Sequence, residues 1–228
     1  MRNLVGLLSV TFAMLSACGG SGGGNDGSSA STPTPSNQSI TLSGAQSTAL
    51  GTVYSTQLIG SDSNGVAYSG TYSVANRAQT MLNGVLVVPR DTLLSLSDRA
   101  GAPAINVTTT SYLDTSGNLI LIVVQTIGWA CAPASPDHMP SVVQVGDFGI
   151  LSTLTCNDNT TLEGSWRIED AGNGNVRVVN SATQKDRFNS IISVTESADT
   201  IDANGNIIGF KTVTNRPSSH FSLTYQSI

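Results

Sequence analysis

A serine, an aspartate and a histidine lie close together in one proline-rich stretch of this 228-residue chain, at Ser135, Asp137 and His138. These are the residue types that a hydrolase uses as nucleophile, orienting acid and base. A triad depends on how its side chains meet in space, and the sequence has no Gly-x-Ser-x-Gly turn to expose a nucleophile. We expect a solvated, turn-forming loop, so a hydrolase that uses His138 is the least favoured hypothesis. His220 is expected on the surface at the start of the last strand.

Three aspartates in turn sequences could supply oxygen ligands to calcium. Asp114 begins Asp-Thr-Ser-Gly-Asn, Asp202 begins Asp-Ala-Asn-Gly-Asn, and Asp62 stands before a similar Asn-Gly pair. Calcium needs roughly six to eight oxygens, and the spacing of an EF-hand loop is missing. An aspartate that accepts N–H bonds within its own turn accounts for each residue. We therefore predict neither a metal nor a cofactor.

Trp129 is the one aromatic residue for which we predict a ligand contact. A bulky ring at the edge of a proline-rich loop is expected to be partly exposed, and such rings form platforms for sugars and other ligands. Aromatic residues make up only 5% of the chain, and Tyr72 and Trp166 fall on the apolar faces of expected strands. Most of the other rings are therefore assigned to the core.

The first 18 residues indicate where the protein is exported. Arg2 is followed by an apolar run over residues 4–14, too short to span a bilayer, and then by Leu15-Ser16-Ala17-Cys18. This last stretch resembles the lipobox of bacterial lipoproteins. The resemblance implies removal of residues 1–17, acylation of Cys18 by fatty acids such as palmitate and, with Gly19 next, transport to the outer membrane. An ordinary cleaved signal with a chance cysteine is the alternative.

The two remaining cysteines, Cys131 and Cys156, are predicted to form a disulfide. An export signal places them in an oxidising compartment, where pairing is the natural expectation. A metal site would need further ligands, and only His138 lies nearby. Closing this loop stabilises a fold by about 3 kcal/mol in the chain-entropy model.

Residues 18–38 are rich in Gly, Ser, Thr and Pro, and they are expected to form a flexible tether. Charged residues make up 11% of the chain, against roughly 25% in typical soluble domains. Removal of residues 1–17 takes away Arg2 and leaves nine basic against fifteen acidic side chains, a net charge of −6. A mildly acidic chain without a basic cluster is a poor match to nucleic acid. The predicted partners are the membrane, through the lipid anchor, and an envelope protein or a glycan.

Residues 39–228 are predicted to form one all-β domain. Apolar and polar residues alternate over residues 221–226, and residues 119–124 are apolar throughout, as on a strand buried on both faces. Asn-Gly and Gly-Asn pairs separate such runs, and no long helical period follows the signal. The expected strands are 52–58, 68–76, 85–88, 92–97, 105–113, 119–127, 149–155, 162–168, 176–181, 189–196, 207–214 and 219–226. Residues 128–147 contain three prolines and are expected to be a loop outside any central strand.

Two blocks of sequence recur in the same order. Residues 70–74 (Gly-Thr-Tyr-Ser-Val) match residues 164–168 (Gly-Ser-Trp-Arg-Ile), and residues 112–120 match residues 200–208. The pattern predicts an internal duplication, and chance recurrence of turn sequences is the alternative.

The sequence thus predicts an antiparallel β-sandwich or flattened barrel built from two related meanders, about residues 50–127 and 147–226. The domain is expected at the periplasmic or cell-surface face of the outer membrane, held there by lipid. The leading functional hypothesis is a non-enzymatic binding or interaction module of the cell envelope, because no catalytic constellation appears. The second hypothesis is a periplasmic carrier with an apolar ligand inside the barrel.

Overall fold

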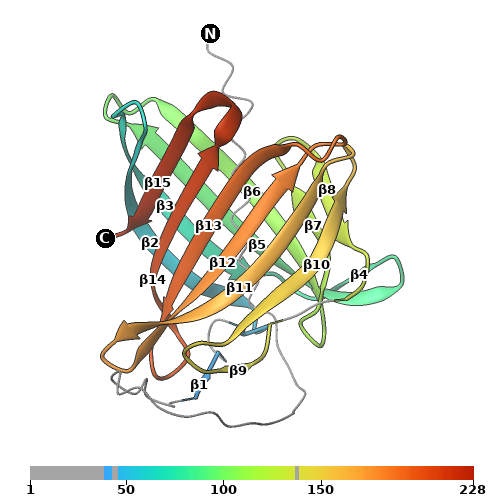
Figure 1. The fold of residues 1–228 in the computed structure, drawn as a ribbon. Helices are drawn as coiled ribbons and strands as arrows, with labels where there is room; N and C mark the ends of the chain where they lie inside the picture. The colour runs from blue at the N-terminus through green and yellow to red at the C-terminus, as the bar shows by residue number, and fades with distance from the viewer. Residues whose placement is uncertain (1–38, 43–45, 137–138) are drawn as a thin grey trace, which may run out of the picture.

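A computed structural model describes residues 39–42, 46–136 and 139–228. A sheet of thirteen strands closes on itself through pairing of β3 with β5, so that twelve strands form a closed antiparallel barrel and β4 is an extra strand (Figure 1). The lipobox with Cys18, the tether, Asp137 and His138 lie outside the described residues. Within the described ranges, no helix is long and apolar enough to cross a membrane.

The barrel strands are β2 (Gly51–Asp62), β3 (Ala67–Asn76), β5 (Val85–Asp98), β6 (Pro103–Asp114), β7 (Leu119–Val124), β8 (Trp129–Pro133), β10 (Phe148–Cys156), β11 (Thr161–Gly172), β12 (Asn175–Lys185), β13 (Ile191–Ile201), β14 (Ile207–Arg216) and β15 (Phe221–Ser227). The extra strand β4 spans Thr80–Leu82. A separate two-stranded sheet pairs β1 (Ile40–Thr41) with β9 (Val142–Val143), and a short 3-10 helix, η2 (Pro217–Ser219), precedes β15.

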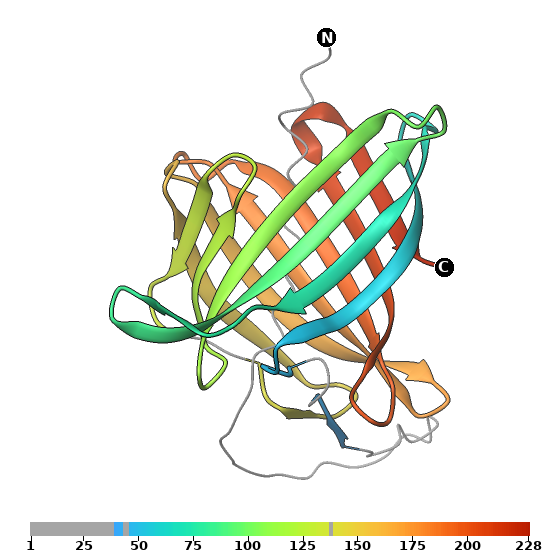
Figure 2. The same cartoon turned by 180° about the vertical axis from the view of Figure 1, so that it is seen from behind.

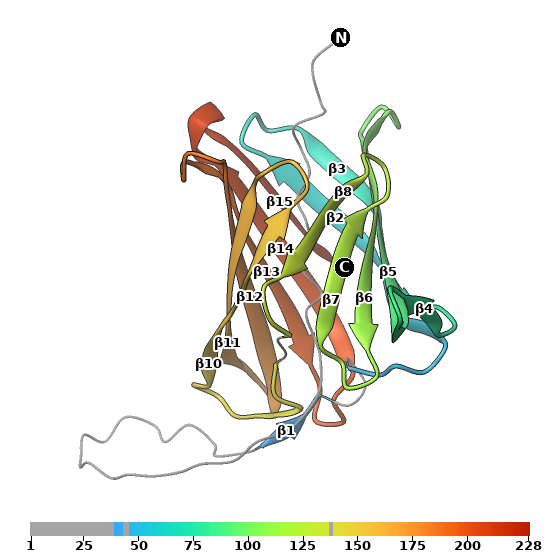
Figure 3. The same cartoon turned by 90° about the vertical axis from the view of Figure 1, so that its right-hand side faces the viewer.

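The barrel consists of two six-strand halves that follow one another in the chain. The first half contains β2, β3 and β5 to β8, and the second contains β10 to β15. The halves meet at two seams, where β8 pairs with β10 and β15 pairs with β2. Figure 2 presents the first half from its outer side, and Figure 3 shows the two halves as opposite walls. The expected all-β flattened barrel is confirmed, and the sheet is closed.

The two recurring blocks of sequence fall at matching places in the two halves. Residues 70–74 lie on β3 and residues 164–168 on β11, which are the second strands of their halves. Residues 112–120 and 200–208 each span the turn from the fourth to the fifth strand of a half. The duplication itself stays a prediction. A duplicated chain would place the repeated blocks at equivalent strands of the two halves, which is where they lie.

One strand continues through a proline at which a break was expected. Two separate strands, 85–88 and 92–97, were expected around Pro89, but β5 is unbroken. Proline lacks the N–H that a ladder needs. Pro89 lies where the neighbour on one side of β5 changes from β4 to β3, and its carbonyl accepts a hydrogen bond from the backbone N–H of Arg77 there. The missing donor therefore leaves the strand intact.

The proline-rich connection between the halves also contains a strand. Residues 128–147 were expected to be a loop outside any central strand, but β8 lies within them and pairs with both β7 and β10. The expectation was wrong because Pro133 is the last residue of β8, where a missing donor costs little. Further along the same connection, β9 pairs with β1.

Two clusters of buried apolar side chains organise the barrel. The larger cluster draws on strands of both halves and lies inside the barrel. The smaller cluster packs residues of β1 and β9 against β10 to β13 at the lower end in Figure 1. It includes Ile40, Met139, Val143, Trp166 and Ile201. One end of the barrel is thus covered by the β1–β9 sheet, whereas short turns such as those at Asp62–Val66 form the other end.

Candidate functional site

The inward faces of β5 to β8 and of β12 to β14 differ in the kind of side chain that predominates. Successive residues of a strand point to opposite sides of a barrel wall, so every second residue faces the interior. On β5 to β8 these residues are mostly apolar, and we call the following set the apolar wall: Leu94, Leu96, Ile105, Val107, Leu113, Leu119, Ile122, Val124, Trp129 and Cys131. On β12 to β14 they are mostly polar, and we call the following set the polar wall: Asn180, Ser193, Thr195, Ser197, Asp199, Thr212 and Thr214.

The strand register sets four residues of the polar wall side by side. Ser197 on β13 is directly opposite Asn180 on β12 and Thr212 on β14. Asp199 is two residues further along β13 and is diagonal to both, a separation of about 7–8 Å between Cα atoms in antiparallel sheets. Three neighbouring strands therefore contribute to one polar patch of the inner surface.

Part of this patch has no hydrogen-bond partner. The hydroxyls of Thr195 and Thr214 lie 3.1 Å apart and satisfy one another. Asn180 and Thr212 are 3% and 0% exposed, yet the Asn180 amide nitrogen and oxygen and the Thr212 hydroxyl have no partner in the part of the chain that the structure describes. An unpaired buried polar group costs about 1–3 kcal/mol. Because such groups are rare in native proteins, these atoms are the strongest sign of a binding site in the molecule.

Asp199 adds a carboxyl group to the patch. Its side chain is 3% exposed, and no hydrogen bond or charged partner among the described residues contributes to its pKa, which burial alone shifts. Burial disfavours the charged form and raises the pKa of Asp199 from 3.8 to about 7. Near neutral pH the group therefore exchanges between a neutral acid and a buried anion.

Aromatic rings bring the first half of the barrel close to Asp199. Tyr72 of β3 stacks on Phe210 of β14, with ring centroids 4.0 Å apart, and Phe210 is directly opposite Asp199. Tyr54 and Tyr225 flank this stack at centroid distances of 6.2 and 5.9 Å. Burial raises the pKa of Tyr72 well above its ordinary value, and the charge of Asp199 adds to the shift. Tyr72 is therefore a neutral phenol at physiological pH.

A buried guanidinium in the first half has partners within the chain. Arg90 Nε donates to Asn76 Oδ1 at 2.9 Å, and Arg90 Nη2 donates to the Ser47 carbonyl at 2.6 Å. Asn76 in turn donates to the carbonyls of Ser47 and Ala49. Burial lowers the pKa of Arg90 to about 10, so the group stays protonated at neutral pH. These contacts fasten residues 47–49 to the barrel.

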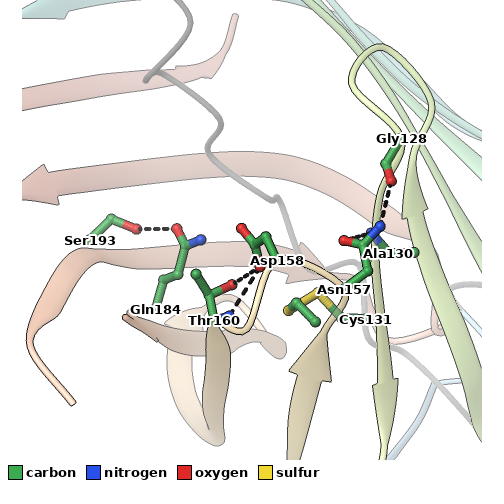
Figure 4. Close-up of a disulfide and its surroundings, with 9 residues drawn as sticks. Gly128, Ala130, Cys131, Asn157, Asp158, Thr160, Gln184 and Ser193 are labelled. Atoms are coloured by element: carbon green, nitrogen blue, oxygen red, sulfur yellow. Dashed lines mark hydrogen bonds between the residues drawn. A yellow bond between two sulfur atoms is a disulfide. The ribbon is translucent and has the colours of Figure 1, made fainter. Parts of the chain in front are cut away.

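The predicted disulfide is confirmed, and it joins the halves at the β8–β10 seam (Figure 4). Cys131 and Cys156 are directly opposite one another, with their Sγ atoms 2.10 Å apart. Beside it, Asn157 accepts a hydrogen bond from the Ala130 backbone N–H at 3.2 Å and donates to the Gly128 carbonyl at 2.9 Å. Covalent and polar contacts therefore fix this seam together.

Other polar groups near the disulfide are paired within the chain (Figure 4). Thr160 donates to Asp158 Oδ1 from its hydroxyl at 2.7 Å and from its backbone N–H at 3.0 Å. Burial raises the pKa of Asp158, but these hydrogen bonds outweigh it and the pKa is lowered. Ser193 donates to Gln184 at 3.3 Å. Among the described residues, the buried side-chain atoms without a partner are therefore those of Asn180 and Thr212 and the indole nitrogen of Trp129.

Trp129 faces the interior of the barrel. The ring was expected to be partly exposed, but it is 5% exposed and belongs to the larger core cluster. The expectation was wrong because residue 129 begins a central strand. Its indole nitrogen lies near Asp158 but forms no hydrogen bond of acceptable geometry within the described chain. A ligand contact at Trp129 stays a prediction. The ring would make this contact from the apolar wall, inside the barrel.

The three aspartates considered as calcium ligands are turn residues, as expected. Each accepts hydrogen bonds from the backbone N–H groups two and four residues later, at 2.9 and 3.0 Å for Asp62, 2.8 and 2.8 Å for Asp114, and 2.9 and 2.8 Å for Asp202. Among the described residues, no group of three His, Cys, Asp or Glu side chains is placed to hold a metal ion.

The residues considered for hydrolysis are not brought together in the described part of the chain. The Ser135 hydroxyl lies 3.1 Å from that of Ser152, and Asp137 and His138 are outside the described residues. His220 follows η2 and is exposed, with φ of 51°, which confirms the expected surface position.

The outer face of the second half carries a polar groove of about 400 Å³ across β11 to β15. Three of its charged side chains form ion pairs: Glu169 contacts Arg167 at 2.8 Å and Arg177 at 3.5 Å, and Glu196 contacts Arg167 at 3.1 Å. Exposed pairs of this kind are worth little energetically. The groove is therefore a weaker candidate than the polar wall.

Asn180, Asp199 and Thr212 are not among the residues predicted from the sequence. One signal was present: Ser193, Thr195, Ser197 and Asp199 stand at every second position, which is how the residues of one strand face are spaced. That signal was masked because the residues of the other face include the apolar Ile192, Val194 and Ala198, so that the alternation alone predicts that face as the buried one.

Comparisons of the chain with protein-family models, with curated proteins and with solved structures give no match, so the residues of the barrel alone support a function.

Proposed function

We propose that this protein is a lipid-anchored, non-enzymatic binding protein of the bacterial outer membrane, and that it holds a small amphipathic ligand between the apolar and polar walls. The observation that carries the proposal is the pair of enclosed, unpartnered side chains, Asn180 and Thr212. A ligand that hydrogen-bonds to them would remove the free-energy penalty of burying polar atoms that have no partner in the described chain. The apolar wall would hold the rest of the ligand, because each buried methylene contributes about 0.8 kcal/mol.

The number of strands supports an interior large enough for a ligand. About eight strands close around their own side chains, and wider barrels enclose ligands or channels. The two halves touch where Tyr72 stacks on Phe210. The ligand is therefore expected beyond this contact, between β5 to β8 and β11 to β13. The β1–β9 sheet covers one end of the barrel, so the ligand would enter at the other end, among the short turns.

The test is native mass spectrometry of the full chain, purified gently from the membrane fraction. We expect a bound small molecule of reproducible mass that is released on denaturation. The double variant Asn180→Leu/Thr212→Val should lose it, because it replaces the three unpartnered atoms of the polar wall with hydrocarbon. Lys211→Gln is the matched control, since Lys211 precedes Thr212 on β14 and lines the outer groove.

The two tryptophans give a second measurement. Trp129 and Trp166 are the only tryptophans in the chain, and both are buried in the barrel clusters. A ligand between the walls should change their fluorescence. A wild-type chain that carries no bound molecule, and whose fluorescence is unchanged by added amphiphiles, would overturn the proposal.

The lipid anchor is proposed on the lipobox resemblance and has its own test. Labelled palmitate should be incorporated into the wild-type chain and not into Cys18→Ser. A mature N-terminus at any residue other than 18 would contradict this part of the proposal without affecting ligand binding.

A further inference from the structure

We propose that the ligand of the barrel carries a protonated amine, and that Asp199 is the residue that binds it. This inference rests on the proposed function and names its substrate class, a cationic amphiphile. Its hydrocarbon would contact the apolar wall, and its ammonium group would contact the polar wall.

The polar patch offers oxygen acceptors in the right number. An ammonium group has three N–H donors and no acceptor. Asp199 supplies a carboxylate, and it is flanked diagonally by the Asn180 amide oxygen and the Thr212 hydroxyl, which have no partner in the described chain. A carboxylate ligand would instead bring a second negative charge to Asp199, which is unfavourable in a buried site.

No basic side chain of the described chain neutralises Asp199. The ionisable groups that approach this region from the first half are Tyr54, Tyr72 and Arg90, and Tyr225 approaches from β15. Tyr72 is neutral at physiological pH. Arg90 directs its Nε and one terminal nitrogen to Asn76 and to the carbonyl of Ser47. The positive charge that would pair with Asp199 is therefore left for a ligand to supply.

The burial of Asp199 makes a cation more favourable than a neutral ligand. Without a partner, burial raises the pKa of Asp199 to about 7, because the anion has lost its water. An ammonium group placed beside it restores a charged partner, and a buried ion pair with additional hydrogen bonds is the arrangement that offsets desolvation. Binding should therefore draw Asp199 into its ionised form.

Three probes of equal chain length separate the possibilities: octylamine, octanol and octanoate. They share the same hydrocarbon and differ in carrying a cationic, neutral or anionic head. Each is titrated into the purified full chain at pH 8, with tryptophan fluorescence and calorimetry as readouts. The variants are Asp199→Asn and, as a control at the next residue of β13, which lines the outer groove, Thr200→Ser.

We expect octylamine to bind the wild-type chain at least about tenfold more tightly than octanol, a difference of about 1.4 kcal/mol, with octanoate weakest. In Asp199→Asn the two affinities should become equal within about twofold, whereas Thr200→Ser should keep the preference. At pH 6, octylamine binding to the wild-type chain should release nearly one proton, seen as a calorimetric heat that depends on the buffer. This measurement needs no variant.

The outcomes distinguish the two proposals. Equal binding of octylamine and octanol, strongest binding of octanoate, or a preference that survives in Asp199→Asn would overturn the amine inference and leave ligand binding in the barrel standing. Failure of all three probes to bind would overturn the proposed function itself.

Discussion

The two halves of the barrel have the same number of strands and face one another, but the apolar wall in the first half and the polar wall in the second differ in chemistry. The apolar wall of β5 to β8 consists of aliphatic, aromatic and cysteine side chains, and it stabilises the fold simply by being buried. The polar wall of β12 to β14 is buried to the same degree and consists of Ser, Thr, Asn and Asp. Burial of such groups is unfavourable unless each finds a partner. The comparison is therefore the reason why we propose that the polar wall contributes to a ligand site.

The contrast holds for buried charge as well. Arg90 in the first half lies against the Asn76 side chain and the Ser47 carbonyl, so its burial is compensated within the chain. For Asp199 in the second half, no hydrogen bond or charged partner among the described residues contributes to the pKa. The barrel thus contains two buried ionisable groups that differ: Arg90 is hydrogen-bonded within the chain, whereas the pKa of Asp199 is set by burial alone. The following variants test whether that difference is real.

The largest effect is expected from glycines at matching positions of the two halves, Gly70 on β3 and Gly164 on β11. A Cβ on Gly70 would overlap the carbonyl oxygen of Ser95, which is backbone and cannot move aside. A Cβ on Gly164 would meet Leu151 Cδ1 at 3.2 Å, and that side chain can turn away. Gly70→Ala should cost at least about 3 kcal/mol and Gly164→Ala about 1 kcal/mol or less, measured by chemical denaturation. Equal costs would show that the halves tolerate crowding alike.

The architecture could be predicted from the sequence because its signals are local. Alternation of apolar and polar residues and Asn-Gly turns indicated most strands, and cysteine number with the export signal indicated the disulfide. The short strand β8 was not found, since five residues between Gly128 and Pro133 give no clear alternation. The polar wall was not found because Ile192, Val194 and Ala198 make the other face of β13 the more apolar one, and alternation alone predicts that face as buried. Only the pairing register, which is not local, decides that Asp199 faces inward.

Asp199→Asn should change how stability depends on pH. The folded-state pKa of about 7 lies above the ordinary 3.8, so the stability associated with the neutral acid is present below pH 4 and lost as pH rises through 7. The variant has no group to ionise. Relative to the wild type, it should gain about 3 kcal/mol of unfolding free energy between pH 5 and pH 8, since each pKa unit is worth about 1.4 kcal/mol.

Ser197→Ala is the control for this measurement, because it alters the same face of β13 without removing an ionisable group. Its difference from the wild type should be the same at pH 5 and pH 8. If Asp199→Asn behaves like Ser197→Ala, then Asp199 is not a desolvated carboxyl, and the contrast with Arg90 disappears.

The disulfide tests how firmly the two halves are joined at the β8–β10 seam. Cys131→Ala/Cys156→Ala should lower the unfolding free energy by about 3 kcal/mol. The disulfide joins residues separated by 25 positions, and without it the unfolded chain gains conformational entropy. Chemical denaturation with and without a reducing agent measures it. The reducing agent should bring the wild type to the value of the double variant and leave the variant unchanged. A wild type insensitive to reduction would mean that noncovalent contacts hold this seam, as they do at the β15–β2 seam.

The smallest and most direct comparison exchanges valine and threonine between the walls. Val124 and Thr212 are both 0% exposed, and their side chains have nearly the same shape. Val124→Thr places a hydroxyl in the apolar wall and should cost about 1–2 kcal/mol, whereas Thr212→Val removes a hydroxyl without a partner and should stabilise the ligand-free chain by about 1 kcal/mol. Thermal unfolding of the ligand-free protein measures both. With the native ligand bound the sign for Thr212→Val should reverse, because the hydroxyl then has a partner to lose. If Thr212→Val destabilises the ligand-free chain, Thr212 is a satisfied structural residue, and the polar wall is no more functional than the apolar one.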